Sequence, residues 1–433
     1  MTTIYALASA KGRAGVAVMR LSGEDSGIAL ASLSGRDVPP PRQAALRSFV
    51  DPHSGMTIDR GLAIWFPGPA SFTGEDVAEL HLHGGPSVIA AMAAALDRLG
   101  LLPAEPGEFS RRAFEHGKLD LTEAEGIADL VNAETEAQRL QALRQMDGAL
   151  GAVYEGWRGD LIRALAFLEA DLDFPDEDLP GGLAARVMPD LQRLSAEIRN
   201  HLADERRGEA LRDGFQIVIT GAPNVGKSSL LNALARRDVA IVSEIAGTTR
   251  DIIEVRLDLG GYPVTLVDTA GLRDSDDIIE QEGVRRARAR AQNADLRLQL
   301  HEAGGALGLG EPDDLIVINK VDIARPSDRP GAFLISVRTG EGIDALLAAI
   351  EDRVVGMMGL RDVPSLTRAR HRRALEAAAG HLDRACAAVA GMLEPELVAE
   401  DVRLAARALG RITGRVDVED LLDVVFGEFC IGK

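Results

Sequence analysis

The pattern of hydrophobic and polar positions changes several times along the chain. From Thr3 to about His116, short apolar runs alternate with glycine and proline turn residues. The runs that we expect to be strands are Gly15–Leu21, Leu62–Phe66 and Val77–Leu82, and Ser87–Leu99 has helical composition. This pattern predicts a compact α+β domain over residues 1–117.

A helical pattern follows, in which apolar residues recur at three- and four-residue spacing and proline is rare. We expect long amphipathic helix from Glu123 to Leu172, broken at Phe174-Pro175 and at Pro180-Gly181-Gly182. The further helical stretches that the spacing predicts are Leu183–Leu211, Thr367–Leu393 and Leu397–Leu409.

Between these helical stretches, short apolar runs alternate with helical segments from Phe215 onward. Continuous apolar runs are typical of central parallel strands, and the expected strands are Phe215–Thr220, Val264–Val267, Leu315–Ile318 and Ala332–Ile335. The pattern predicts a doubly wound α/β domain over residues 212–356, inserted into a helical domain with halves at 118–211 and 357–433. Strand Leu296–Leu300 departs from it, since Arg297 and Gln299 are polar.

Composition narrows the class of protein. The 433 residues include 48 basic and 67 acidic side chains, which gives a net charge of −19. This acidity argues against non-specific coating of nucleic acid, and two cysteines, Cys386 and Cys430, exclude a disulfide framework. The chain lacks a bilayer-length apolar run and a secretory signal pattern, so we expect no membrane association and a cytoplasmic location.

The first chemical motif follows strand Phe215–Thr220. Residues Gly221 to Ser228 read GAPNVGKS, which matches the phosphate-binding loop GxxxxGK[ST] between a strand and the helix Ser229–Ala235. In such a loop, backbone N–H groups surround phosphate oxygens, Lys227 reaches the β and γ phosphates, and the Ser228 hydroxyl binds Mg²⁺.

The further motifs fall in the order of a GTPase domain. Asp268, Thr269, Ala270 and Gly271 follow a strand, where Asp268 orients Mg²⁺ and Gly271 contacts the γ-phosphate. In Asn319-Lys320-Val321-Asp322 a carboxylate can accept both N1–H and N2–H of guanine. Ser336-Val337-Arg338 resembles the loop over the base.

The residue that orients the attacking water is missing from its usual place. Ras-type GTPases have a glutamine directly after the DTAG glycine, whereas this chain has Leu272, which forms no hydrogen bond through its side chain. Another group must position water, and Asn224 and Ser243–Thr249 are the segments in which we expect the compensating chemistry.

Four further motifs are distinctive, namely Gly247-Thr248-Thr249-Arg250-Asp251, Ser71-Phe72-Thr73-Gly74-Glu75-Asp76, Pro106-Gly107-Glu108-Phe109 and Cys430-Ile431-Gly432-Lys433. Together they resemble the MnmE (TrmE) family of tRNA modification GTPases, within the potassium-activated TrmE-Era-EngA-like GTPases. The resemblance covers essentially the whole chain. It implies a homodimer built on N-terminal tetrahydrofolate-binding domains.

For the GTPase domain, the resemblance implies that K⁺ replaces an arginine finger. Asn224, Ser243, Ile245 and Thr248 match the K⁺ ligands, Thr249 matches a second Mg²⁺ ligand, and Glu280 matches the catalytic glutamate that positions water. The implied GTP-binding residues are Asn224, Val225, Gly226, Lys227, Ser228, Ser229, Ser243, Glu244, Ile245, Ala246, Gly247, Thr248, Asp268, Thr269, Ala270, Gly271, Asn319, Lys320, Asp322, Ser336, Val337 and Arg338.

For the N-terminal domain, the resemblance implies that Arg20, Glu79, Lys118 and Lys433 bind 5-formyltetrahydrofolate or a related reduced folate. The family works with an FAD-dependent partner, MnmG, as a heterotetramer. Together they install a carboxymethylaminomethyl-type group at C5 of the wobble uridine, position 34, of certain tRNAs. Taken without the resemblance, Arg20 and Glu79 read as an ordinary ion pair and Lys118 as a solvated turn residue.

Two other functional classes stay open at the level of sequence. One is a regulatory GTPase of the ribosome-assembly type that binds RNA, which would carry a module such as a KH domain. The other is a folate enzyme with a regulatory G domain.

One group of basic residues could contact tRNA phosphates at the start of the predicted helix Thr367–Leu393. The cluster Arg368, Arg370, Arg372 and Arg373 is a candidate, and a solvated helix face is equally compatible with it. Cys430 reads as a buried apolar residue rather than a nucleophile.

Overall fold

The structure is a computed structural model. It describes residues 2–173, 183–204, 206–237, 239–241, 254–268, 294–305, 314–325, 330–359, 364–391, 395–416, 419–427, 429 and 431–432. The chain forms two compact units, one of Met1–Ala128, Gln145–Asp160 and Ala406–Lys433, the other of Asp129–Arg144 and Leu161–Ala405. No helix in the described ranges is long and apolar enough to cross a bilayer.

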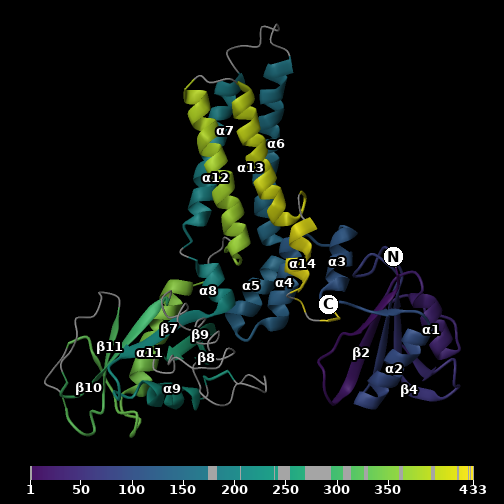
Figure 1. Ribbon diagram of the computed structural model, residues 1–433, viewed down its shortest axis with the longest axis horizontal. Coiled ribbons are helices and arrows are strands. Elements are labelled where there is room, and N and C mark those ends of the chain that lie inside the picture. The colour runs from purple at the N-terminus through teal and green to yellow at the C-terminus, as the bar shows by residue number, and fades with distance from the viewer. Residues whose placement is uncertain are drawn as a thin grey trace, which may run out of the picture. The chain divides into compact units, whose positions relative to one another are not determined.

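The first unit contains a six-stranded sheet, of which Figure 1 labels β2 and β4. The strand order is β3-β4-β5-β2-β1-β6, and neighbouring strands are antiparallel except for the parallel pair β1–β6. Its strands are β1 Ile4–Leu7, β2 Ala14–Ser22, β3 Ala45–Val50, β4 Thr57–Phe66, β5 Val77–Gly84 and β6 Leu102–Pro103. Its helices are α1 Ser26–Ser34, α2 Pro86–Arg98, α3 Glu108–Glu115 and α14 Glu419–Gly427.

Strand alternation gives this sheet two different faces. Met19 and Leu21 of β2 are buried against α1 and α2 in the main core of the unit. Arg20 and Ser22 therefore lie on the opposite face, because successive side chains of a strand point to opposite sides. On that face Phe109 of α3 packs with Ile4, Ala6, Ala104 and Phe72 in a smaller cluster.

The second unit contains the α/β domain that the sequence predicts. Its sheet has the order β12-β11-β10-β7-β9-β8 and is parallel except for the β8–β9 pair. The strands are β7 Phe215–Gly221, β8 Glu254–Leu259, β9 Tyr262–Asp268, β10 Leu296–Glu302, β11 Leu315–Asn319 and β12 Phe333–Leu334. Leu230 of α9 Lys227–Ala235 and Leu346 of α11 Ile343–Met358 pack into its core.

In strand β10, Leu296, Leu298 and Leu300 are buried, whereas Arg297 and Gln299 are only partly buried. The polar residues thus share one half-exposed face of an inner strand, which accounts for the departure from an apolar run.

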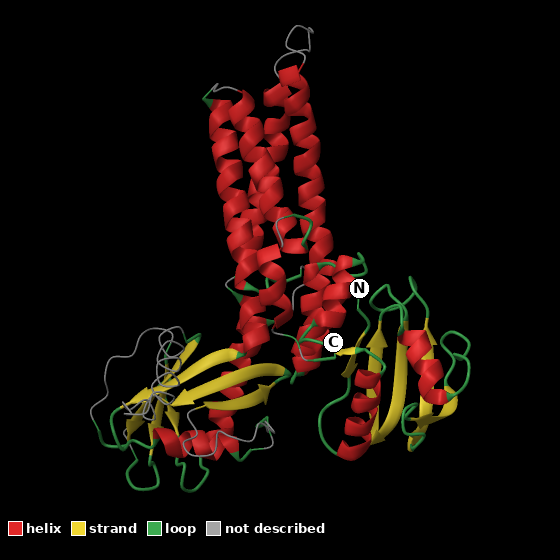
Figure 2. Ribbon diagram, turned by 45° about the vertical axis from the view of Figure 1, so that its right-hand side comes forward, coloured by secondary structure: helices red, strands yellow, loops and turns green. Residues whose placement is uncertain are grey.

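Long helices make up most of the remaining chain (Figure 2). Within the second unit α7 Leu183–Leu202 packs along α12 Ala369–Ala390, and α8 Arg207–Asp213 precedes the sheet. Four further helices have residues in both units, and they are α4 Leu121–Asn132, α5 Glu136–Met146, α6 Ala149–Asp173 and α13 Pro395–Thr413.

The predicted continuous helix from Glu123 to Leu172 is wrong, because α4, α5 and α6 divide it. Gly148 has a φ of 81°, a left-handed conformation that ends the pattern between α5 and α6. The start of α5 is a capping box: Gln138 accepts hydrogen bonds from the Glu134 and Thr135 backbone N–H groups at 3.0 and 3.1 Å. Leu183–Leu211 is likewise two helices, α7 and α8.

Candidate functional site

The phosphate-binding loop connects β7 to α9 and needs glycine at two places. A Cβ on Gly221 would lie 2.2 Å from the Leu300 carbonyl oxygen, and one on Gly226 would lie 2.4 Å from Asn319 Nδ2. Both residues also have positive φ, 144° and 102°. Asn224 has a φ of 65°, a conformation that asparagine adopts more readily than most residues. The loop therefore folds back on itself beside the N-terminus of α9.

Lys227 lies at the start of α9 and is 8% exposed. Its Nζ donates hydrogen bonds of 2.9 and 3.0 Å to the carbonyl oxygens of Gly221 and Ala222. The ammonium is thus held within the loop, where it adds a positive charge to the partial charge of the helix N-terminus.

Ser228 and Asp268 meet at the carboxyl ends of β7 and β9. The Ser228 hydroxyl donates a hydrogen bond to Asp268 Oδ2, and Asp268 is 2% exposed at the end of β9. A hydroxyl beside a carboxylate is a hard-oxygen donor set of the kind Mg²⁺ prefers, with phosphate oxygens completing its shell. These residues therefore fit Mg²⁺. Across the described ranges, no group of three or more His, Cys, Asp and Glu side chains is arranged as a metal cage.

The predicted guanine-binding residues form one connected group. Asn319 is 3% exposed; its Nδ2 donates 2.9 Å to the Val225 carbonyl oxygen, and its Oδ1 accepts 3.2 Å from the Val337 backbone N–H. Lys320 Nζ donates to the Asn224 carbonyl oxygen at 2.9 Å. Asn319 and Lys320 thus tie the phosphate-binding loop to the segments that would surround the base.

Asp322 contacts the third of these segments. Its Oδ1 accepts a hydrogen bond of 2.7 Å from the Ser336 hydroxyl, and Arg338 Nε lies 3.1 Å from its Oδ2. The Arg338 side chain is 80% exposed, so water screens this ion pair. Guanine N–H donors would compete with Arg338 for Oδ2.

Part of the predicted site lies outside the described residues. This holds for the expected K⁺ and switch residues, the catalytic glutamate and one folate contact, namely Ser243, Glu244, Ile245, Ala246, Gly247, Thr248, Thr249, Thr269, Ala270, Gly271, Glu280 and Lys433. Cys430 is also among them.

In the N-terminal domain, the structure brings Arg20 and Glu79 together as cross-strand neighbours. Arg20 Nη2 and Nε lie 2.9 and 3.1 Å from Glu79 Oε1, and His81 Nε2 lies 3.3 Å from Glu79 Oε2. Lys118 is exposed and lies near Gly74, where an added Cβ would be 3.4 Å from Lys118 Cε.

Two aromatic rings that the sequence did not single out as site residues lie near Arg20. Its guanidinium carbon lies 5.6 Å from the centre of the Phe72 ring and 5.9 Å from that of Phe109, within cation–π range. Both residues belong to motifs that carry the family resemblance, and this was the signal available in the sequence.

The basic cluster at the start of α12 does not form one phosphate-binding surface. Arg368 is 8% exposed and its Nη2 lies 2.7 Å from Asp129 Oδ1. Arg372 pairs with Asp204 at 2.6 Å and with Glu209 at 3.1 Å, and its side chain is 13% exposed. These two arginines already form ion pairs within the second unit, which argues against them as contacts for tRNA phosphates.

The second unit also contains a cavity of about 720 Å³ between α5, α8 and the β7–β9–β8 part of the sheet. Both signs of charge line it, including Glu134 and Arg256, which lie 3.1 Å apart. None of the predicted GTP-binding side chains is among its lining residues, so this cavity is separate from the phosphate-binding loop.

These features define a P-loop protein of the GTP-binding class. They are a mostly parallel sheet, a phosphate-binding loop, and an Asn-Lys-x-Asp segment that contacts this loop. Family models match nearly the whole chain: the GTP-binding protein TrmE N-terminus over residues 3–118 and the MnmE helical domain over residues 121–430. The chain therefore belongs to the MnmE family of tRNA modification GTPases.

Individual relatives agree with this assignment. The tRNA modification GTPase MnmE of Parvibaculum lavamentivorans is 61% identical over 100% of both chains, and that of Maricaulis maris is 55% identical over 100% of both. Among solved structures, the FeoB G-domain from Methanococcus jannaschii aligns with 32% of this chain and 97% of its own length, at 23% identity and a TM-score of 0.23. The two family models and the two observed sheets confirm the predicted fold of an N-terminal α+β domain, a helical domain and an α/β G domain.

Proposed function

We propose that this chain hydrolyses GTP, with Mg²⁺ and K⁺, as part of a tRNA-modifying enzyme. The proposal rests on the way the carboxyl ends of β7, β9 and β11 meet at the phosphate-binding loop. Lys227 lies within the loop that follows β7, Asp268 at the end of β9 is hydrogen-bonded to Ser228, and Asn319 at the end of β11 is hydrogen-bonded to Val225. In this arrangement the loop amides and Lys227 bind the phosphates, and Asp322 accepts N–H groups of guanine.

Ser228 and Asp268 would hold Mg²⁺, which supplies neutralisation of the charge on the β and γ phosphates when bound. Thr249 is proposed as a further ligand. The Leu272 side chain cannot hydrogen-bond to water. By its match to the catalytic glutamate of the family, Glu280 is proposed to position the attacking water.

Asn224 is proposed to hold K⁺ together with Ser243, Ile245 and Thr248. Two features of Asn224 support this role. The residue is exposed in the phosphate-binding loop, and its carbonyl oxygen accepts a hydrogen bond from Lys320 that fixes the left-handed backbone. A cation there would compensate negative charge that develops during phosphoryl transfer, as an arginine finger does elsewhere.

For the N-terminal domain we propose binding of a reduced folate such as 5-formyltetrahydrofolate, with Arg20, Glu79, Lys118 and Lys433 as contacts. An Arg guanidinium suits a glutamyl carboxylate and a carboxylate suits pterin N–H donors. The Arg20–Glu79 pair offers both groups, and Arg20 lies 5.6 Å from the centre of the partly buried Phe72 ring.

At the level of the assembly, we propose a cytoplasmic homodimer that works with the FAD-dependent MnmG. The complex would modify C5 of the wobble uridine in certain tRNAs, with the one-carbon unit drawn from the folate. The family membership of the chain supports this proposal.

Nucleoside analysis of bulk tRNA tests the function directly. A strain without the gene is complemented with wild type, Asp268→Ala or Asp344→Ala, the last being a control because Asp344 is an 81%-exposed carboxylate on the same domain. Wild type and Asp344→Ala should restore the C5-modified wobble uridine, whereas Asp268→Ala should not. Full restoration by Asp268→Ala would show that GTP hydrolysis is not needed.

A further inference from the structure

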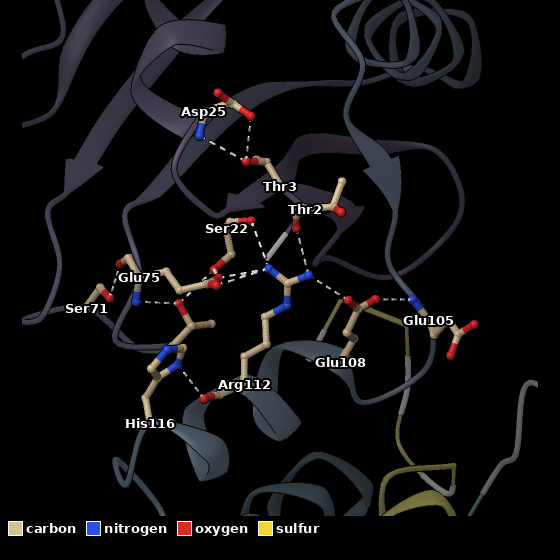
Figure 3. Close-up of polar contacts among 11 residues, drawn as sticks. Thr2, Thr3, Ser22, Asp25, Ser71, Glu75, Glu105, Glu108, Arg112 and His116 are labelled. Carbon is tan, nitrogen blue, oxygen red and sulfur yellow. Dashed lines mark hydrogen bonds and ion pairs between the residues drawn. The ribbon is translucent and has the colours of Figure 1, made fainter.

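Figure 3 shows a cluster of ion pairs and hydrogen bonds around Arg112 on α3. Arg112 is 6% exposed, and its Nη1 lies 3.0 Å from Glu75 Oε2 while its Nη2 lies 2.8 Å from Glu108 Oε1. Nη2 also donates to the Thr2 carbonyl oxygen at 2.9 Å. One guanidinium is thus shared by two carboxylates and the N-terminal strand segment.

Hydrogen bonds extend the cluster into the loop before β5. The Ser22 hydroxyl donates to Glu75 Oε2 at 2.7 Å and lies 2.7 Å from Thr73 Oγ1. The Glu75 backbone N–H donates to Thr73 Oγ1 at 3.3 Å, and Ser71 donates to the Glu75 carbonyl oxygen. Arg112, through Glu75, therefore fixes the loop residues 71–75 against β2.

This arrangement matters because the loop and α3 each carry one of the rings beside Arg20. Phe72 belongs to the fixed loop, and Phe109 lies one turn before Arg112 on α3. Ser22 lies two residues after Arg20 on β2, so both side chains occupy the same face of the sheet. The cluster thus joins the three segments that set the distances from Arg20 to Phe72 and to Phe109.

We propose that Arg112 is a positioning residue for an anionic, planar aromatic ligand held at Arg20 beside the partly buried Phe72 ring, which packs against the buried Phe109. The inference rests on the reduced-folate pocket proposed above and deepens it. A fixed aromatic frame reduces the ordering that binding requires, so losing Arg112 weakens affinity even though Arg112 does not contact the ligand. Glu75 and Glu108 then lack their shared cation, and the loop with Phe72 is released from α3.

The test is calorimetric titration of the full chain with 5-formyltetrahydrofolate. The variants are Arg112→Met, Arg112→Lys, Arg20→Ala and Arg111→Met. Arg111 is the matched control, because it neighbours Arg112 on α3 but is 40% exposed and pairs with Glu115 and Asp423. We expect Arg112→Met to weaken binding about tenfold at unchanged stoichiometry, Arg112→Lys to recover part of the loss, and Arg111→Met to bind as wild type.

The number of ligand-binding sites per chain distinguishes a positioning role of Arg112 from a purely structural one. Partial unfolding would reduce the number of sites per chain and leave the affinity of the remaining sites unchanged, an outcome that overturns the inference. A second measurement combines Arg112→Met with Phe72→Leu: if Arg112 acts through Phe72, the joint loss is smaller than the product of the single losses. If the double variant loses affinity by the full product of the two single losses, Arg112 does not act through Phe72.

Failure of the inference and failure of the folate proposal give different results. If wild type does not bind, or if Arg20→Ala binds as tightly as wild type, the folate pocket itself is overturned. If wild type binds, Arg20→Ala does not, and Arg112→Met matches wild type, only the positioning role of Arg112 is wrong.

Discussion

The side-chain amide of Asn319 donates a hydrogen bond of 2.9 Å to the backbone carbonyl oxygen of Val225, across 94 residues of sequence. With Oδ1 accepting from Val337, one buried side chain connects the phosphate-binding loop to the loop expected over the base. The part of the site that reads the base and the part that binds phosphate are therefore mechanically linked.

Replacing Asn319 with alanine should loosen both loops. Two hydrogen bonds are lost and buried backbone groups remain without partners, so we expect a cost of about 2–3 kcal/mol in the stability of the G domain. GDP affinity should fall at the same time. Thermal unfolding and nucleotide titration measure the two effects, with Asn232→Ala on the exposed side of α9 as control. Unchanged nucleotide affinity would contradict the linkage.

Asp322→Asn should change the base that the site selects. The carboxylate accepts N1–H and N2–H of guanine, whereas an amide presents one donor and one acceptor, which suits the C2 carbonyl of xanthine. We expect GTP affinity to fall about 100-fold and XTP affinity to rise. Hydrolysis of GTP and XTP measured side by side is the test, and equal loss with both nucleotides would show damage to the fold rather than altered specificity.

Asp129→Ala should destabilise the second unit. Asp129 Oδ1 lies 2.7 Å from Arg368 Nη2 and 3.3 Å from Arg212 Nε, so its removal leaves a buried cation behind. We expect a cost of about 3–5 kcal/mol. Glu169→Ala is the control, because the Glu169–Arg403 pair is about half exposed and worth below about 1 kcal/mol. Urea unfolding, monitored by hydrogen exchange in α12, measures the difference in stability between the two variants.

The ion pairs of Arg372 predict how this residue affects the binding of tRNA. Arg372 already pairs with Asp204 and Glu209, so Arg372→Met should leave the salt dependence of tRNA binding unchanged. Each phosphate contact that is lost lowers the slope of log affinity against log salt by roughly 0.7–0.9. Filter binding over a range of KCl concentrations is the measurement, with the exposed Arg373→Met for comparison. A reduced slope for Arg372→Met would restore this residue as a phosphate contact.

The success of sequence reasoning depended on how local each feature is. Strands β7, β9 and β11 were predicted because inner parallel strands are continuous apolar runs, and the phosphate-binding loop is contiguous in sequence. Strand β3 was missed because Ala45–Val50 is mostly half-exposed or exposed, so its pattern is weak. The start of α5 was missed although Thr135 and Gln138 have capping-box spacing.

Side-chain partners distant in sequence were beyond reach for a different reason. Arg112 pairs with Glu75 and Arg368 with Asp129 only because the topology brings those elements together. An arginine at the start of a helix looks the same in sequence whether it faces water or a buried carboxylate. Composition and spacing therefore predicted the strands and the loop around Lys227, whereas the ion pairs of the buried arginines were not predicted.

His201, near the end of α7, should make the second unit less stable at mildly acidic pH. Burial lowers the pKa of His201 below its ordinary value of 6.5; Asp204 opposes this shift and Arg372 adds to it. The unfolded chain then binds a proton near pH 6.5 that the folded chain does not bind until a lower pH, so stability falls as pH decreases from 6.5 toward the folded pKa.

His201→Gln should remove this contribution, which is below about 1.4 kcal/mol per pH unit, and leave stability at pH 8 nearly unchanged. Urea unfolding at pH 8, 6.5 and 5.5 measures it, and the exposed His53→Gln serves as control. An identical pH slope in His201→Gln and wild type would show that His201 protonates equally in both states.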